Sequence, residues 1–151
     1  MEYLILFLPL IGSIISGFFG KTIGDRLSQL ITCILVSISA LLSLFIFFKV
    51  VSSGYEHNAI IATWINSGSL NVNWSIKVDA LSAVMLVVVT LVSSLVHIYS
   101  VGYMSHDPHK PRFMSYLSLF TFAMLTLVTS DNFLQLFFGW EGVGLCSYFL
   151  I

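Results

Sequence analysis

The run Ala80–Val101, ALSAVMLVVVTLVSSLVHIYSV, decides the fold class because its 22 residues include no Asp, Glu, Lys or Arg. A helix rises about 1.5 Å per residue and the hydrocarbon core of a bilayer is about 30 Å thick, so roughly 20 apolar residues cross it. We therefore predict a membrane-spanning helix here. Asp79 directly precedes it and is expected to cap its N-terminus, where the helix dipole favours a carboxylate.

The whole composition points the same way. Hydrophobic residues make up 58% of the chain and charged residues 9%, with a mean hydropathy of +0.99, outside the range of ordinary soluble domains. The net charge of -1 gives no reason to expect a nucleic-acid partner. Four further apolar runs accompany the first: Tyr3–Phe19, Ser28–Val50, Phe113–Thr129 and Asn132–Ile151. The sequence predicts an all-α polytopic membrane protein with about five transmembrane helices.

Three short connections are expected between these helices. Gly20–Arg26 and Ser105–Arg112 read as charged loops, the second ended by two prolines. Ser130–Asn132 leaves room only for a tight turn, so the fourth and fifth helices should be antiparallel neighbours. We expect Asp131 to cap the fifth helix.

The long connection Val51–Asp79 has a different pattern. Apolar and polar residues alternate strictly from Leu70 to Val78, which is the period of a half-buried strand. Ile60–Ile65 can pair with it across Asn66–Ser69. We predict a small extramembrane β-hairpin over residues 60–78, lying across the helix ends.

Basic residues favour one orientation in the membrane. The two short loops contain four, and the opposite side contains two: Lys21, Arg26, Lys110 and Arg112 against Lys49 and Lys77. The positive-inside rule then places the short loops and Ile151 on the cytoplasmic side, and the N-terminus and hairpin outside.

Glu141 is the main candidate for a functional residue. It lies about nine residues, or roughly 14 Å, from either end of its apolar run, close to the bilayer midplane. A charge there costs at least about 2.5–3.5 kcal/mol, so such residues usually mark ion or proton pathways. The alternative is a protonated, hydrogen-bonded structural glutamate. Gly139, Gly142 and Gly144 remove bulk around it, which serves close helix packing as well as access of water.

His97 is a weaker candidate for a proton relay, because an imidazole titrates near neutral pH. The alternative is an interfacial, hydrogen-bonded histidine near the end of the third helix. His106 and His109 flank Pro108 without metal-ligand companions, and Cys33 and Cys146 lie in apolar runs. We predict no metal site, no disulfide and no cofactor bound by this chain.

Three stretches resemble a known family. They are Val78–Met85, Leu95–Met104 and Asp131–Tyr148, and the last contains Gly-Trp-Glu-Gly-Val-Gly at residues 139–144. All three are similar to subunit L of bacterial NADH-quinone oxidoreductase, equivalent to chain 5 of the mitochondrial complex. The resemblance implies that Glu141 is the glutamate of a first proton half-channel, whose partner lysine stands on a later helix beyond Ile151.

The resemblance also implies how the chain is organised and where it works. Residues 1–129 would form transmembrane helices 1–4 with the hairpin 60–78, and residues 130–151 the fifth helix, at the start of a truncated antiporter-like, proton-translocating domain. Other membrane subunits of the complex would be its partners, and NADH, FMN, iron–sulfur clusters and quinone would bind to partner subunits. A bacterial inner membrane is expected, with the mitochondrial inner membrane as the alternative.

Two alternatives to this function stay open. Subunits of cation/proton antiporters and of membrane-bound hydrogenases share the domain, although the glycine-rich motif is closer to the respiratory subunit. The other alternative is a non-catalytic membrane remnant, since no polar or basic flank follows the last apolar run. On either view we expect residues 1–151 alone to be inactive as a translocase.

Overall fold

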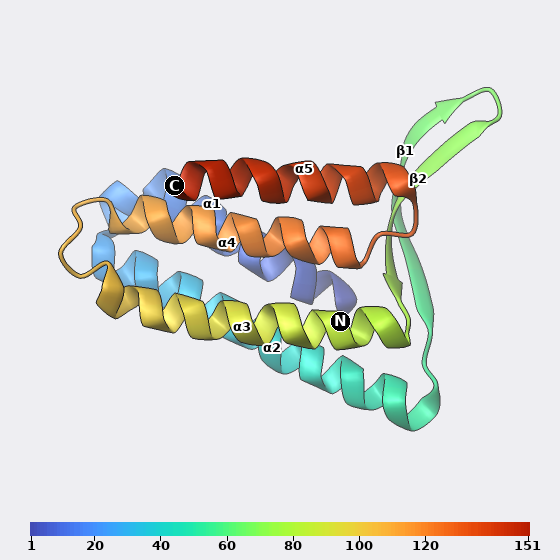
Figure 1. The fold of residues 1–151 in the computed structure, drawn as a ribbon, viewed down its shortest axis with the longest axis horizontal. Coiled ribbons are helices and arrows are strands. Elements are labelled where there is room, and N and C mark those ends of the chain that lie inside the picture. The colour runs from blue at the N-terminus through green and yellow to red at the C-terminus, as the bar shows by residue number, and fades with distance from the viewer.

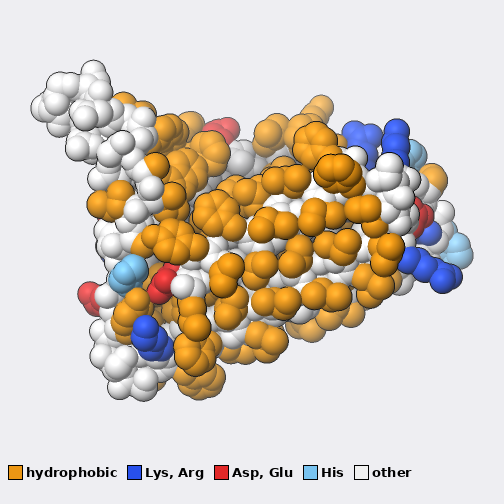
Figure 2. Space-filling model, turned by 180° about the vertical axis from the view of Figure 1, so that it is seen from behind, with side chains coloured by type: hydrophobic (Ala, Val, Ile, Leu, Met, Phe, Trp, Pro, Cys, Tyr) orange, Lys and Arg blue, Asp and Glu red, His pale blue; other side chains and the backbone are white.

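The computed structural model describes all 151 residues and contains five helices that run side by side (Figure 1). They are α1 (Glu2–Ile23), α2 (Asp25–Ser53), α3 (Ala80–Tyr103), α4 (Lys110–Val128) and α5 (Phe133–Leu150). All five are long and apolar enough to cross a membrane. The predicted fold class is therefore confirmed. Hydrophobic side chains cover the flank of the bundle, as the space-filling view in Figure 2 shows.

The predicted loop Gly20–Arg26 is wrong. Helix α1 continues to Ile23 and α2 begins at Asp25, so that Gly24 alone connects them. Its φ of 90° is a conformation that glycine adopts without steric cost, which lets one residue reverse the chain. Pro111 was likewise expected to end a loop, but it lies in the first turn of α4, where a missing N–H costs nothing.

The predicted hairpin is present between α2 and α3. Strand β1 (His57–Ser67) pairs antiparallel with β2 (Leu70–Val78), and the turn is only Gly68-Ser69, with φ 59° at Gly68. Strand β2 has the predicted bounds, whereas β1 is longer and the turn tighter than predicted. In Figure 1 the base of the hairpin crosses the ends of the helices and its tip extends beyond them.

The apolar core lies where the hairpin crosses the helix ends. Ile76 and Val78 of β2 are both 1% exposed and belong to a buried cluster with residues of four helices. Those residues are Ile5, Leu6, Ile46, Val50, Ala83, Leu86 and Leu125. Strand β2 is therefore packed onto the helix ends as part of the fold.

Elsewhere the helices meet through small polar residues. The Ser39 hydroxyl donates to the Ile5 carbonyl at 2.7 Å, and the hydroxyls of Ser43 and Thr90 lie 2.7 Å apart between α2 and α3. Small residues let membrane helices approach closely, and their hydroxyls bond across the interface. The bundle interior is accordingly held by packing and hydroxyl bonds.

Candidate functional site: the last helix and its anchors

Glu141 lies near the midpoint of α5, as predicted. Its side chain is exposed on the outside of the bundle and makes no hydrogen bond or ion pair within the chain. Helix α5 packs against α4 and has only three buried residues, Gln135, Gly139 and Cys146. The carboxylate therefore stands on a face of α5 that no other helix of this chain covers.

The three glycines around Glu141 have different surroundings. A Cβ on Gly139 would lie 2.8 Å from the Leu127 Cα, and one on Gly142 would lie 3.1 Å from the Ala123 Cβ. These two glycines allow α4 and α5 to pack closely. A Cβ on Gly144 would meet no atom within 4 Å, so the backbone on that side, one helical turn from Glu141, is open to approach.

The start of α5 is bonded to the outer edge of β2. Gln135 is fully buried; its Oε1 accepts from the Ser75 N–H at 3.0 Å and its Nε2 donates to the Ser75 carbonyl at 2.7 Å. The Asn132 amide donates to the Asn73 carbonyl at 2.8 Å, and the Lys77 N–H donates to the Thr129 carbonyl at 2.9 Å. The segment leading into α5 thus occupies the strand edge that β1 leaves free.

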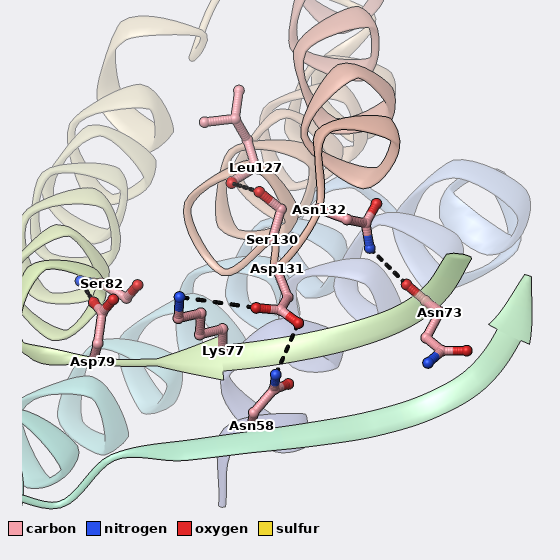
Figure 3. Close-up of polar contacts among 9 residues, drawn as sticks. All are labelled: Asn58, Asn73, Lys77, Asp79, Ser82, Leu127, Ser130, Asp131 and Asn132. Carbon is pink, nitrogen blue, oxygen red and sulfur yellow. Dashed lines mark hydrogen bonds and ion pairs between the residues drawn. The ribbon is translucent and has the colours of Figure 1, made fainter. Parts of the chain in front are cut away.

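Figure 3 shows the polar contacts around this segment. Asp131 does not cap α5, contrary to the prediction: it accepts from the Asn58 amide at 2.8 Å and lies 3.8 Å from the Lys77 Nζ. The cap is Asn132, whose Oδ1 accepts from the Gln135 N–H at 2.9 Å, because it is the residue directly before the first helical turn.

The predicted cap at Asp79 is confirmed. Its Oδ1 accepts from the Ser82 N–H at 2.7 Å, a contact that is also drawn in Figure 3. The pKa of the Asp79 carboxyl is lowered, mainly because this backbone bond favours the charged form, with a smaller contribution from the nearby Lys77 charge.

Aromatic rings strengthen the link between the hairpin and α5. The Phe138 ring lies 4.9 Å from Trp74 and 6.0 Å from Trp64, centroid to centroid, in edge-to-face arrangements. Such pairs contribute about 0.5–1.5 kcal/mol beyond the area they bury. Phe138 is three residues before Glu141, so the hairpin fixes the half of α5 that leads to the carboxylate.

His97 of α3 is fully buried and faces α4. It is hydrogen-bonded, as the structural alternative expected. Its Nδ1 lies 2.7 Å from the Ser93 carbonyl oxygen and its Nε2 lies 3.0 Å from the Ser118 hydroxyl. No hydrogen bond connects it with Glu141, so the structure does not bring the two candidates together. Sequence reasoning missed Gln135, although a lone amide in an apolar run was a visible signal.

These features define a class, a multi-pass membrane bundle with a hairpin after its second helix and an ionisable residue within its fifth. One solved structure with this fold is titled "Structure of the membrane-bound sulfane sulfur reductase (MBS), an archaeal respiratory membrane complex". It matches with a TM-score of 0.80 over 97% of this chain and 29% of that chain. At 20% identity this shows likeness of fold alone.

The particular family follows from sequence. Residues 64–114 match the family described as NADH-Ubiquinone oxidoreductase (complex I), chain 5 N-terminus. The chain is 56% identical over its whole length to NADH-ubiquinone oxidoreductase chain 5 of Arabidopsis thaliana, and 54% identical over 97% of it to that of Phytophthora infestans. The resemblance seen in the sequence is confirmed: over nearly its whole length the chain is similar to complex I chain 5.

The chain spans about a quarter of the curated relatives it matches, 23% in Arabidopsis thaliana and 22% in Phytophthora infestans. One further relative has a different name. A Neurospora crassa protein called "Probable intron-encoded endonuclease 4" is 51% identical over 97% of this chain and 27% of its own length. Similarity over this segment alone therefore does not fix the activity of the whole protein.

Proposed function

We propose that this chain serves as the N-terminal segment of a membrane subunit of respiratory NADH:quinone oxidoreductase and takes part in proton translocation. The observation that carries the proposal is the match over 97–100% of the chain to relatives named chain 5, at 54–56% identity. Other membrane subunits of the complex would be its partners. NADH, FMN, iron–sulfur clusters and quinone would bind to partner subunits, which would also carry out the redox chemistry.

Glu141 would be the residue that exchanges protons. It is a carboxylate halfway along an apolar helix, on a face that the five helices leave open. A charge in that position needs a polar partner or a water-filled path. The sequence that the relatives have in addition offers room for such a partner, and the open backbone at Gly144 offers a place beside the carboxylate.

His97 is the second candidate in this proposal, and its surroundings favour a structural role over a proton relay. Both ring nitrogens already have partners, one on α3 and one on α4. A relay would need Ser118 to pass the proton on, whereas joining α3 to α4 requires nothing more than the bonds present. We therefore assign His97 to holding the two helices together.

The mitochondrial inner membrane fits the relatives better than the bacterial membrane expected first, because the similar chain 5 proteins come from plants, fungi, a red alga and an oomycete.

Met1 and the hairpin lie at one end of the bundle, and the α1–α2 and α3–α4 connections at the other (Figure 1). The more basic connections would face the matrix. The division at residues 129 and 130 stays a prediction.

The test is Glu141→Gln in a full-length chain 5 that carries this segment, assembled in complex I. This change keeps shape and hydrogen bonding but removes the titratable charge. We expect NADH-driven proton pumping to fall while complex assembly is unaffected. Glu56→Gln is the matched control, because Glu56 is exposed between α2 and β1, outside the spanning helices. If Glu141→Gln pumped protons as well as the Glu56→Gln control, Glu141 would have a structural role instead.

The alternative of a non-catalytic membrane segment is favoured by one observation, the Neurospora crassa relative that is named an endonuclease. The reconstituted 151-residue chain decides a narrower question. We expect liposomes containing it to conduct no more protons than empty ones, because Glu141 has no Lys or Arg partner within the chain. A proton flux that disappears with Glu141→Gln would contradict this expectation.

A further inference from the structure

Helices α1 and α4 approach closely at the end of the bundle opposite the hairpin. A Cβ on Gly17 would lie 2.7 Å from the Ser115 hydroxyl, and one on Gly20 would lie 2.6 Å from the Pro111 Cβ. Hydroxyls bridge the two helices: Ser16 donates to the Pro111 carbonyl at 2.7 Å, and Ser115 donates to the Ser13 carbonyl at 2.8 Å. The two helices are therefore packed tightly here, and the hydroxyls between them already have hydrogen-bond partners.

A cavity of about 720 Å³ lies along this contact. Its size is within the roughly 300–1,000 Å³ typical of small-molecule sites. Only four of its sixteen lining residues are hydrophobic, so it suits a ligand with a polar part. Lys21 and Arg112 lie toward the helix ends, and Ile14 and Leu119 each lie seven residues deeper, about 10 Å along the helix. The cavity therefore runs from a basic mouth to an apolar inner end.

The two cations at the mouth have no carboxylate partner. Arg112 donates only to the Tyr116 hydroxyl, at 3.0 Å, and Lys21 forms no ion pair. Asp25 is the one acidic residue of the lining, and Lys110 already lies 3.7 Å from it. Figure 2 shows Lys and Arg side chains gathered at the end of the bundle opposite the hairpin. An anion at the mouth would neutralise charges that the chain leaves unpaired.

We propose that this cavity binds the phosphate headgroup of an anionic phospholipid, with Lys21 and Arg112 contacting the phosphate. A guanidinium and an ammonium are the usual partners of phosphate, and basic pockets between membrane helices bind anionic headgroups. The apolar inner end favours a lipid over free phosphate, because Ile14 and Leu119 can contact its acyl chain.

The experiment measures lipid retained by the 151-residue chain in nanodiscs of phosphatidylcholine mixed with phosphatidylglycerol, by native mass spectrometry. The variant is Lys21→Gln/Arg112→Gln. The matched control is Lys49→Gln/Lys77→Gln, which removes two charges at the hairpin end. We expect the variant to retain phosphatidylglycerol about 30-fold less tightly, at about 1 kcal/mol per basic residue, and the control to behave as the unmodified chain. Equal loss in both doubles would mean unspecific charge attraction and would overturn the proposal.

Two further measurements distinguish a bound phospholipid from free phosphate and test the inner end of the cavity. Displacement of phosphatidylglycerol by added inorganic phosphate would mean that the mouth binds phosphate in general. Loss of phosphatidylglycerol from the Leu119→Trp variant, which keeps both cations, would support the lipid. Retention unchanged in Leu119→Trp and in the Lys21/Arg112 double variant would reject the site. So would the absence of anionic phospholipid from this position in complex I assembled with a full-length chain 5, where a later helix could fill the cavity.

Discussion

The two ends of the bundle are completed in different ways. At the hairpin end both lysines and Glu2 have partners: Lys77 lies near Asp131, Lys49 lies 3.6 Å from the Tyr55 ring centroid, and the Tyr55 hydroxyl donates to Glu2 at 3.2 Å. At the other end Lys21 and Arg112 have no carboxylate partner and border a cavity. The hairpin end is stabilised by contacts within the chain, whereas the basic end depends on its surroundings for neutralisation.

At the hairpin end, the substitution expected to destabilise the fold most is Gln135→Leu. This change leaves the buried N–H and carbonyl of Ser75 without their partner, and each unsatisfied group costs about 1–3 kcal/mol. We expect the free energy of unfolding to fall by about 2–4 kcal/mol, and the Ser75 amide to exchange its hydrogen faster. Unfolding in mixed micelles together with hydrogen exchange measures both. Asn71→Ala, at an exposed position of the same strand, should change neither.

A smaller effect is expected halfway between the two ends, where α5 packs on α4. Gly139→Ala would place a Cβ 2.8 Å from the Leu127 backbone, so the helices must separate, at a cost of about 1–3 kcal/mol. Gly144→Ala meets no atom and should be neutral or stabilising, by up to about 1 kcal/mol from helix propensity. The same unfolding measurement compares them. Equal costs for the two variants would contradict the close packing assigned to Gly139.

The cap at Asp79 offers a pH-dependent test at the hairpin end. Since the pKa of this carboxyl is lower in the folded state, its stabilising effect is complete above the unfolded pKa and is lost as pH falls through the folded one. Asp79→Ala should cost about 1 kcal/mol at neutral pH, and less in acid. Asp79→Asn keeps an acceptor and should remove the pH dependence alone. Unfolding at neutral and acid pH distinguishes the three chains.

The smallest effect is expected at the basic end. Lys110 and Asp25 form a partly exposed ion pair at 3.7 Å, and ion pairs near the surface contribute about 0–1 kcal/mol. Lys110→Gln should therefore change the free energy of unfolding by less than about 1 kcal/mol, and the change should diminish in high salt. A loss as large as that of Gln135→Leu would mean that this end is also held by its own charge pairs.

The sequence was sufficient to predict elements that depend on local periodicity. Five apolar runs and one alternating segment determined the five helices and the hairpin, because burial in lipid and half-burial of a strand leave different repeats. The depth of Glu141 followed from counting residues along α5. The single-residue link at Gly24 was missed, since it depends on a positive φ that a charged, glycine-containing stretch does not reveal.

The contacts between distant segments could not be predicted in this way. Gln135 and Ser75 are 60 residues apart in the sequence, and their bonds depend on how β2 crosses the helix ends. The choice between Asp131 and Asn132 as cap depended on a one-residue shift of the helix start. Glu141 stands on a face of α5 that no residue of this chain covers.

The pairing of β2 with the segment before α5 also protects the hairpin from aggregation. An uncovered strand edge is a template on which another chain can add a strand. Thr129, Asn132 and Gln135 bond to the outer edge of β2, so between Asn73 and Lys77 only the outer edge of β1 is available for such addition. Strand β1 is interrupted by register shifts between Ile60 and Ala62 and between Thr63 and Ile65. Bulges of this kind disturb a regular hydrogen-bonding edge, so a hairpin that extends beyond the helices remains a poor partner for a second copy of itself.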